Sequence, residues 1–384
     1  MKRYYFDHAA STPMHPEVAR VMLDILTTTV GNASSIHRFG REARQLLNQA
    51  RDKIAAGIGC SPSELIFTSG GTESDNTAIV GIARAGRKRG KSHIITSAVE
   101  HHAVLHTCEA LEREGFRITV LPVDEYGQVS TADVEAAVEP DTALITIMYA
   151  NNETGTIQPI EEIGRIARSN GVIFHVDAVQ AMGLLPINLR SLPVDLMSFS
   201  AHKINGPQGV GALYVGRQIL LDPLLSGGTQ ERKRRAGTEN VAGIVGFAKA
   251  FELSVNLMSE RKLFLDKLRY TWIERLQELV DQERIVLNGH PSDRLPHIVN
   301  LSFIGVDTET LLMNLDLEGI AASSGSACTA GALEPSHVLR AMRISQERLS
   351  SAVRFSFGLG NTTDELEQAA KKVATFVNRV RNNS

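Results

Sequence analysis

Lys203 lies between an apolar run, residues 196–201, and a turn predicted at Gly206-Pro207. The apolar run has the length of a short buried strand, and the glycine and proline favour a turn. We therefore expect Lys203 to project from the carboxyl end of that strand, where open α/β sheets bind their ligands. A lysine that is partly removed from water loses its proton more readily, and the neutral amine can form a Schiff base with an aldehyde. A solvated loop lysine is the alternative, and this stretch alone does not decide between the two.

Three polar side chains are predicted to meet at one edge of the same sheet. Asp177 and Asn152 end apolar runs of their own, as Lys203 does, and the carboxyl ends of parallel strands share an edge. A carboxylate that faces a Schiff-base lysine suits pyridoxal phosphate, because it keeps the pyridine nitrogen protonated and the ring then accepts carbanion charge. The alternative for Asp177 is a helix N-cap.

Residues 69–76 follow a predicted strand and open a predicted helix, and they include two glycines followed by Thr72. Free amide groups at a helix N-terminus, together with the helix dipole, bind phosphate groups. The stretch lacks the Gly-Lys-Ser/Thr ending of a nucleotide-binding P-loop. A plain glycine-containing turn is the alternative interpretation.

Cys328 stands in a run of small residues, 323–331, that contains two glycines. This composition predicts a mobile loop, whereas a structural cysteine would sit among larger apolar residues. A thiol on an exposed loop is placed to act as a nucleophile, with a reactivity set by its thiolate fraction.

Two other patterns point to different kinds of site. His102 and His106 share one face of a predicted helix, as metal ligands would, but the spacing lacks the glutamate and the third ligand of helical zinc sites. We expect no metal, and a flat imidazole at this strand-to-helix junction would instead stack on a cofactor ring. The basic run at 232–235 is similar to nucleic-acid-binding patches, but such runs more often lie on solvated surface.

Overall composition favours a small-molecule ligand. The 384-residue chain carries 40 basic and 43 acidic residues, for a net charge of −3, which gives no broad footprint for nucleic acid or a membrane. The N-terminus lacks the apolar core of a signal peptide, and no apolar run has the length of a transmembrane helix. The three cysteines, Cys60, Cys108 and Cys328, fit a reducing compartment. We therefore expect a cytoplasmic protein.

Six apolar runs alternate with helical stretches, which is typical of a mostly parallel, doubly wound α/β sheet. Residues 210–215 follow Lys203 too closely for a helical crossover and are predicted to form a seventh, antiparallel strand. The six runs are residues 64–68, 93–97, 117–121, 143–148, 172–176 and 196–200.

The last part of the chain predicts a smaller α/β domain. Residues 241–280 are mainly helical in pattern, most simply one long helix that links two domains. A capping box at 362–365 opens a final helix. We divide the chain into an N-terminal arm that packs with the small domain (1–15), a large domain (16–255) and a small domain (256–384). The strand candidates of the small domain are 284–287, 297–303, 320–323 and 352–357.

Nearly end to end, these features closely resemble the pyridoxal-phosphate-dependent cysteine desulfurases of the class V aminotransferase-like family. The closest likeness is to the group with a Ser-Ser-Gly-Ser-Ala-Cys motif, here at 323–328. The resemblance implies a fold-type I PLP-dependent transferase, with a seven-stranded, mostly parallel sheet and a small C-terminal domain that carries the cysteine loop. It also implies that Lys203 is the Schiff-base lysine, and that Cys328 takes the sulfur of L-cysteine as a persulfide while L-alanine is released.

The resemblance further implies roles for individual residues. Asp177 would pair with the pyridinium nitrogen, Gln180 would donate to the ring hydroxyl, and His101 would stack on the ring. The substrate carboxylate would be held by Asn32, Asn152 and Arg354, because an arginine fork suits a carboxylate. The phosphate would be bound by Gly71, Thr72, Ser200 and His202, with Thr238 reaching it from a second subunit.

A homodimer and a sulfur-acceptor protein are therefore expected, and the acceptor would be an iron–sulfur scaffold or a tRNA-thiolation protein. A selenocysteine lyase and a related class V aminotransferase are the alternative enzymes. A non-catalytic sulfur carrier is the alternative from another class. An aminotransferase would have no use for Cys328, and a protein without catalytic activity would have no use for Lys203.

Overall fold

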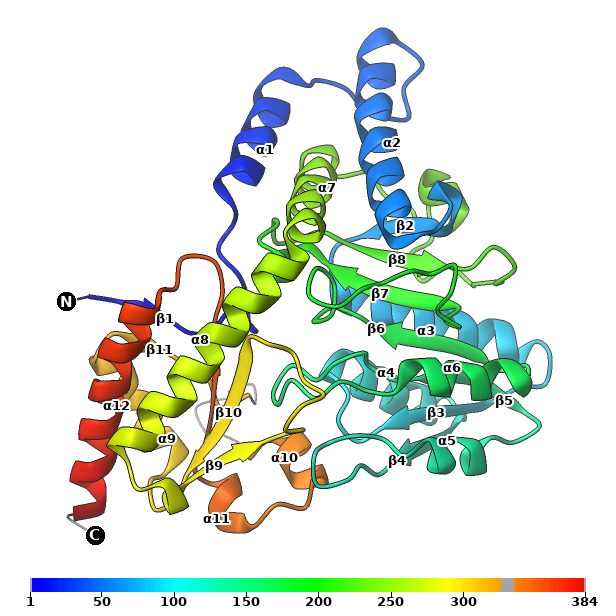
Figure 1. Cartoon of the computed structure of the whole chain (residues 1–384). Helices are drawn as coiled ribbons and strands as arrows, with labels where there is room; N and C mark the ends of the chain where they lie inside the picture. The colour runs from blue at the N-terminus through cyan, green and yellow to red at the C-terminus, as the bar shows by residue number, and fades with distance from the viewer. Residues whose placement is uncertain (1, 326–334, 383–384) are drawn as a thin grey trace.

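The computed structural model describes residues 2–325 and 335–382, so Cys328 lies outside the described residues. A seven-stranded sheet of order β2-β8-β7-β6-β5-β3-β4 forms the larger part of the fold (Figure 1). Strand β8 pairs antiparallel with both β2 and β7, and every other pair in this sheet is parallel. The predicted mostly parallel sheet is thus confirmed. Its strands are β2 (Leu65–Thr68), β3 (His93–Ser97), β4 (Arg117–Leu121), β5 (Thr142–Thr146), β6 (Ile173–Asp177), β7 (Leu196–Ser200) and β8 (Gly211–Val215).

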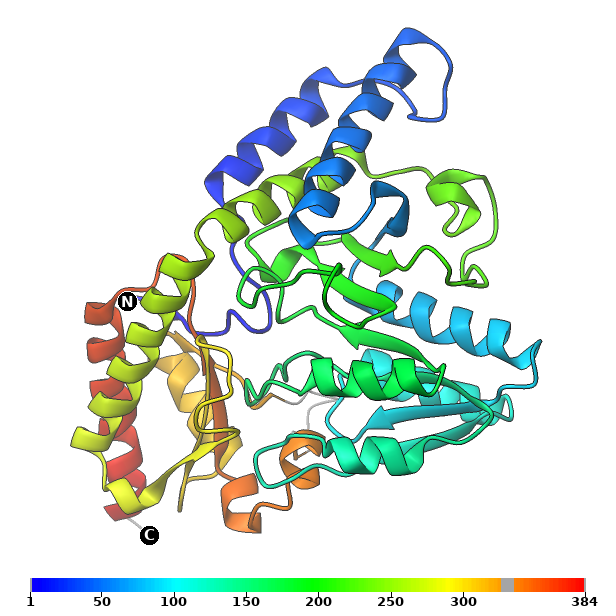
Figure 2. The ribbon, with the colours of Figure 1, turned by 45° about the vertical axis from the view of Figure 1, so that its right-hand side comes forward.

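Helices cover both faces of this sheet (Figure 2). Successive strand residues point to opposite faces, and Leu144 and Ile145 accordingly enter two different hydrophobic cores. Helices α3 and α4 close one core, whereas α2, α6 and α7 close the other. Except for the partly exposed edge strand β4, the strands are buried almost throughout, which explains why their sequences are continuous apolar runs. The helices of this part are α1 (Pro16–Thr28), α2 (Arg38–Ile58), α3 (Gly71–Arg87), α4 (His102–Arg113), α5 (Thr131–Ala137), α6 (Ile160–Ser169) and α7 (Val241–Asn256).

A second, antiparallel sheet of order β12-β10-β9 has a core of its own. Trp272 lies at its centre, with ring centroids 5.4 Å from Phe6 and 4.8 Å from Phe355. Strand β1 (Tyr4–Tyr5) pairs with β11 (Ile320–Ala321), so the N-terminal arm packs on this core. The remaining elements are α8 (Met258–Leu279), β9 (Ile285–Asn288), β10 (Ile298–Phe303), α9 (Thr308–Leu317), α10 (His337–Ala341), α11 (Gln346–Leu349), β12 (Ala352–Ser356) and α12 (Thr363–Asn382).

The prediction of a single long helix over 241–280 is wrong. The structure has two helices, α7 and α8, which meet at Leu257 with a bend of 74°. Helix α7 packs on α1 and α2, whereas α8 packs on α12 (Figure 1). Because these partners belong to separate cores, the chain changes direction where one core ends and the other begins. The division of the chain at residues 15 and 255 remains a prediction.

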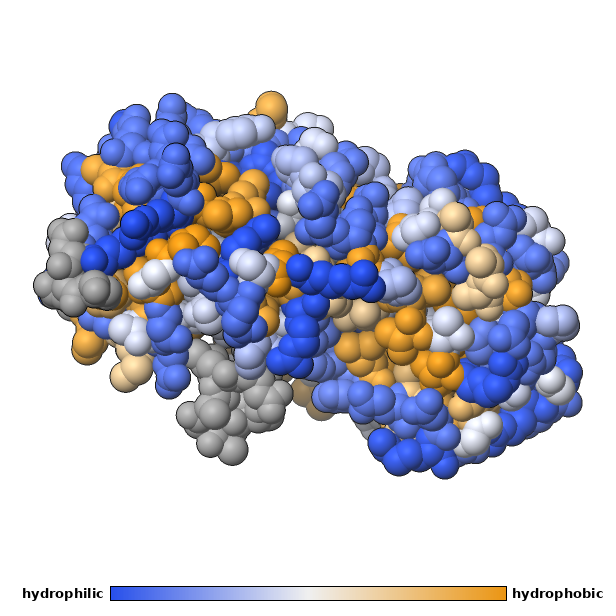
Figure 3. All heavy atoms as spheres, turned by 90° about the horizontal axis from the view of Figure 1, so that it is seen from below, coloured by the Kyte–Doolittle hydropathy of each residue, from blue (hydrophilic) through white to orange (hydrophobic). Residues whose placement is uncertain are grey.

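Within the described part of the chain, no single helix is long and apolar enough to cross a membrane. The bent pair α7 and α8 meets the length and composition requirement only when both helices are taken together. Hydrophilic and apolar side chains are interspersed on the face seen from below (Figure 3).

Candidate active site

A cavity of about 390 Å³ lies at the carboxyl ends of β6 and β7. Asp177 is the last residue of β6, Ser200 is the last of β7, and Lys203 closes the short 3₁₀ turn that follows (Ala201–Lys203). The sheet edge thus brings together side chains from separate strands. The sequence-predicted residues that line the cavity are Gly71, Thr72, His101, Asn152, Asp177, Gln180, Ser200, His202, Lys203 and Arg354.

Three predicted residues are not among those lining it. Asn32 is exposed in the loop between α1 and α2, where its Oδ1 accepts a hydrogen bond from the Ser34 backbone N–H at 2.8 Å. Thr238 is exposed in the segment before α7. Cys328 falls outside the described residues. The roles predicted for Asn32, Thr238 and Cys328 therefore remain predictions.

Lys203 is largely buried and faces the N-terminal arm. Its Nζ donates to the backbone carbonyls of Ala9 and Ala10, the second at 2.8 Å. Burial, followed by the positive charge of Arg354, lowers the pKa of Lys203 to about 8, against the opposite effects of Asp177 and Asp7. A substantial fraction of the amine is therefore neutral, and hence nucleophilic, near physiological pH.

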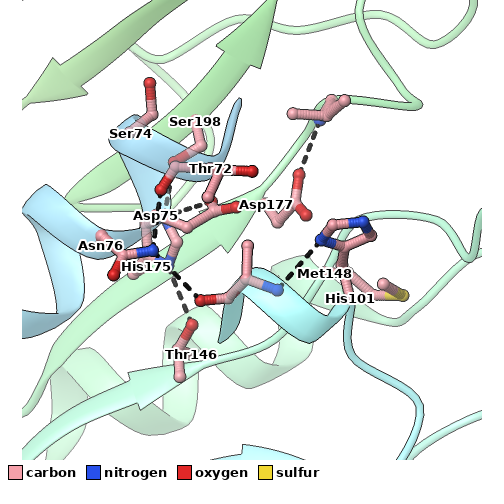
Figure 4. A network of polar contacts seen from close by, with 12 residues as sticks. Thr72, Ser74, Asp75, Asn76, His101, Thr146, Met148, His175, Asp177 and Ser198 are labelled. Carbon is pink, nitrogen blue, oxygen red and sulfur yellow. Dashed lines mark hydrogen bonds and ion pairs between the residues drawn. The ribbon is translucent and has the colours of Figure 1, made fainter. Parts of the chain in front are cut away.

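Asp177 and Asp75 are two buried carboxyl groups with different roles (Figure 4). Asp177 accepts a hydrogen bond from the Val179 backbone N–H at 2.9 Å, and burial raises its pKa to about 6. Burial and the charge of Asp177 raise the pKa of Asp75 well above its usual value. Burial therefore disfavours ionisation of both carboxyl groups, and of Asp75 more strongly.

His175 lies next to Asp75, with its Nε2 3.7 Å from Asp75 Oδ1. Its Nδ1 contacts the Thr146 hydroxyl at 2.8 Å and its Nε2 contacts the Ser198 hydroxyl at 2.9 Å (Figure 4). Burial lowers the pKa of His175 to about 3, so the ring is neutral. A neutral histidine leaves Asp177 as the main source of charge on this side of the cavity.

The opposite end of the cavity offers backbone amides and small polar side chains. Gly70 caps α3 with φ +154°, a conformation that favours glycine, and no side chain caps this helix. A Cβ on Gly71 would lie 2.7 Å from a Val179 methyl group, so the backbone comes close to the sheet edge here. Because its first amides are free of a side-chain cap, the α3 N-terminus is suited to a phosphate group.

Pyridoxal phosphate fits this arrangement. Asp177 uses one carboxylate oxygen for Val179, and its other oxygen makes no hydrogen bond with the described residues, so it is available for a protonated ring nitrogen. His101 caps α4 through its Nδ1 and lines the cavity with a flat ring. Burial, followed by the charge of Lys203, lowers the pKa of His101 to about 4, which keeps that ring neutral. An amine for the aldehyde, a carboxylate for the nitrogen and an amide cradle for the phosphate therefore share one cavity.

Arg354, on β12, supplies the positive charge at the side of the cavity next to the arm. It is only 4% exposed; one of its terminal nitrogens donates to Asp7 Oδ1 at 2.8 Å and the other donates to the Asn152 carbonyl at 2.9 Å. Its buried Nε makes no hydrogen bond among the described residues. The guanidinium is thus fixed in place and suited to a carboxylate.

Sequence reasoning missed four residues of this site. Ala9 and Ala10 act through backbone carbonyls, which no side-chain pattern reveals. Asp7 gave a detectable signal, an acidic residue within a mostly apolar arm, and so did Asp75, an acidic residue that follows the two glycines of residues 69–76.

The histidines on α4 pack against one another and not around a metal. The rings of His102 and His106 stack with centroids 4.8 Å apart, and His337 lies 4.6 Å from His102. Over residues 2–325 and 335–382, no group of three or more His, Cys, Asp or Glu side chains is arranged to hold a metal ion.

Comparison with known proteins gives a consistent result. The aminotransferase class-V family model matches residues 4–369. The chain is 51% identical to putative cysteine desulfurase IscS 1 of Bacillus subtilis (strain 168), over 99% of this chain and 100% of the relative. It is 50% identical to cysteine desulfurase IscS of Methanosarcina thermophila, over 100% of this chain and 94% of the relative. Among solved structures, a NifS-like protein with 38% identity aligns with a TM-score of 0.92, over 98% of this chain and 100% of that one.

Proposed function

This chain belongs to the cysteine desulfurases of the aminotransferase class-V family, and from that premise we propose that it converts L-cysteine to L-alanine and holds the sulfur on Cys328. The enzyme depends on pyridoxal phosphate. The observation that carries the proposal is that Lys203, Asp177 and Arg354, three residues with complementary charges, line one cavity. An amine, a carboxylate and a guanidinium match the aldehyde, the ring nitrogen and the amino-acid carboxylate.

When bound, pyridoxal phosphate supplies an aldehyde that bonds to amines and a ring that accepts an electron pair from a substrate carbon. Asp177 would hold the proton on the ring nitrogen, and Gln180 and His101 would contact the ring. Gly71, Thr72, Ser200 and His202 would hold the phosphate. Lys203 has a second role in addition to the covalent bond, because its neutral amine, favoured by a pKa of about 8, would remove the proton from the substrate Cα.

Arg354 and Asn152 would bind the carboxylate of L-cysteine, and Asn32 remains a third candidate for this role. The terminal nitrogens of Arg354 are held by Asp7 and the Asn152 carbonyl, and each carries a second N–H that can donate to a carboxylate. A guanidinium held in this way binds a carboxylate with little further loss of side-chain entropy. The substrate would therefore be fixed at one end by Arg354 and at the other by its amino group.

The sulfur step is assigned to Cys328. Its thiolate would attack the sulfur of the bound cysteine, so that an S–S bond forms and the carbon–sulfur bond breaks. The electron pair of the broken bond stays on the carbon that takes up a proton to become the alanine methyl group. An acceptor protein, an iron–sulfur scaffold or a tRNA-thiolation protein of the cytoplasm, would then take the sulfur from the Cys328 persulfide.

A homodimer is part of the same proposal. The loop and helices around residues 23–39 expose large apolar side chains, among them Leu26, Ile36 and Phe39 at 68%, 91% and 58%. Such a concentration of exposed apolar groups is typical of an interface. A second copy would cover it and would bring Thr238 to the phosphate of its neighbour. Sedimentation of the holoenzyme tests this, and a monomer that keeps full cofactor affinity would contradict it.

The sulfur step is tested by replacing each cysteine in turn. Cys328→Ala should keep the cofactor and its cysteine-induced absorbance change, whereas alanine formation should stop. Cys60→Ala and Cys108→Ala are matched controls, because burial raises the pKa of both thiols to about 12 and leaves them unreactive. Alkylation and mass mapping after turnover should locate the persulfide on Cys328, and a persulfide on Cys60 or Cys108 would reject the assignment.

A further inference from the structure

A second cavity, of about 350 Å³, lies at the bend between α7 and α8. Figure 1 shows the bend itself. Its wall includes Ile204 and Asn205, the two residues that follow Lys203. Asn205 has a left-handed backbone, φ +63°, and its side chain donates to the Pro13 carbonyl at 2.8 Å. The cavity shares no lining residue with the candidate active site. It is therefore a separate site, next to the 3₁₀ turn that carries Lys203.

Most of this wall is apolar. Ile204 and Leu265 are buried, and Leu257, Phe264 and Leu359 are 48%, 43% and 46% exposed. The volume falls at the lower end of the range of about 300–1,000 Å³ that is usual for small-molecule sites. A hydrophobic cavity of this size, with exposed apolar side chains in its lining, has the shape and polarity to take the apolar body of a small ligand.

One strongly basic side chain interrupts this apolar wall. Arg261 lines the cavity and is partly exposed, and its guanidinium makes no hydrogen bond or ion pair with any residue that the structure describes. Glu260 lines the same cavity, but the two side chains form no ion pair. Burial lowers the pKa of Arg261 to about 10, so the group remains charged at neutral pH.

Two histidines near Arg261 add no further positive charge beside it. Burial, followed by the charge of Arg261, lowers the pKa of His8 to about 4 and that of His297 well below its usual value. Both imidazoles are therefore neutral. A guanidinium that faces an apolar cavity and has no counter-ion among the described residues is poorly compensated, and an anion in the cavity would pair with it.

We propose that this cavity binds a small organic carboxylate with an apolar body, whose carboxylate pairs with Arg261 and whose body contacts Leu257, Phe264 and Leu359. A fork of N–H donors matches a carboxylate geometrically, and the pair would form beside an apolar wall. A neutral molecule of the same shape would gain only the hydrophobic contacts, and an amine would be repelled.

Hexanoate and hexan-1-ol are suitable probes, because they share an apolar chain and differ in charge. In calorimetric titration of the holoenzyme, hexanoate should bind about tenfold more tightly than hexan-1-ol. Arg261→Met should abolish this preference while leaving the binding of hexan-1-ol nearly unchanged. Lys262→Met is the matched control, because it removes a charge from the adjacent residue, which pairs with Asp266 at 3.0 Å and does not line the cavity.

Leu359→Trp provides a second test that leaves Arg261 intact. Leu359 is partly exposed, so an indole there is tolerated and should obstruct the cavity, weakening hexanoate and hexan-1-ol alike. Three results would overturn the proposal: no binding of hexanoate to the holoenzyme, a preference for hexanoate that survives Arg261→Met, or unchanged affinity for both probes in Leu359→Trp. The first of these is also expected if a second copy of the chain fills the cavity.

Discussion

One wall of the candidate active site comes from a single sheet, whereas the facing wall combines distant parts of the chain. The sheet wall consists of Asp177, Ser200 and Lys203 at neighbouring strand ends. The arm wall consists of Asp7, Ala9 and Ala10 together with Arg354, and its ion pair joins residues 347 positions apart. The sheet wall is fixed by strand pairing, but the arm wall exists only when the N-terminal arm packs against β11 and β12.

This difference in construction suggests a difference in function. Backbone pairing on both sides of β6 and β7 gives the sheet wall little freedom, as suits groups that hold a cofactor through every turnover. The arm wall carries Arg354, the proposed partner of the substrate carboxylate. The polar groups of the arm wall contact one another and the sheet wall. Asp7 pairs with Arg354, and the arm carbonyls accept hydrogen bonds from Lys203.

The largest effect is expected from the sheet wall. Lys203→Ala removes the amine that we propose bonds to the cofactor and also acts as the base, so turnover should fall by at least about 10²-fold. Treatment with borohydride followed by mass spectrometry should no longer fix pyridoxal phosphate to the chain. Lys249→Ala is the control, since Lys249 pairs with Glu17 at 2.9 Å away from the cavity. Fixation of the cofactor in Lys203→Ala would disprove the role of this lysine.

The two walls also differ in how far the sequence alone predicts them. Asp177 and Lys203 each follow an apolar run, and parallel strands bring such positions to one edge, so their meeting was predictable without coordinates. No local pattern pairs Asp7 with Arg354, because that contact depends on how the arm folds back over the small sheet. The bend at Leu257 was equally hidden, since neither glycine nor proline marks it.

Asp75 shows a further limit. Its position after two glycines drew attention to phosphate binding, yet its side chain is buried beside Asp177. A sequence gives the type of a titratable group, but its protonation state depends on burial and on neighbouring charges that only the folded chain supplies.

A smaller effect, confined to substrate binding, is expected from Arg354. Arg354→Ala should raise the KM for cysteine about 10- to 100-fold, because a charge-assisted pair with the carboxylate is lost. The cofactor should stay bound, with unchanged absorbance in the absence of cysteine. Arg354→Lys should recover only part of the loss, because lysine keeps the charge without the fork. Steady-state kinetics measure both variants, and an unchanged KM in Arg354→Ala would remove this residue from the substrate site.

The smallest effect is expected from Asp7. This residue tests whether a charge in the arm wall changes the pKa of Lys203 in the sheet wall. The negative charge of Asp7 raises the pKa of Lys203, whereas burial and Arg354 lower it to about 8. Asp7→Asn keeps the shape but removes the charge, so the pKa of Lys203 should fall, by less than about one unit. A lower pKa leaves more neutral amine at a given pH, and the apoenzyme should then react with pyridoxal phosphate faster than the wild type below about pH 8 and equally fast well above it. The rate of reconstitution is followed by absorbance across this pH range, and the midpoint of its pH dependence reports the pKa of Lys203.

Asp7→Glu retains the charge and should keep the wild-type midpoint. A midpoint in Asp7→Asn at or above that of the wild type would show that the arm wall does not set the protonation of the lysine.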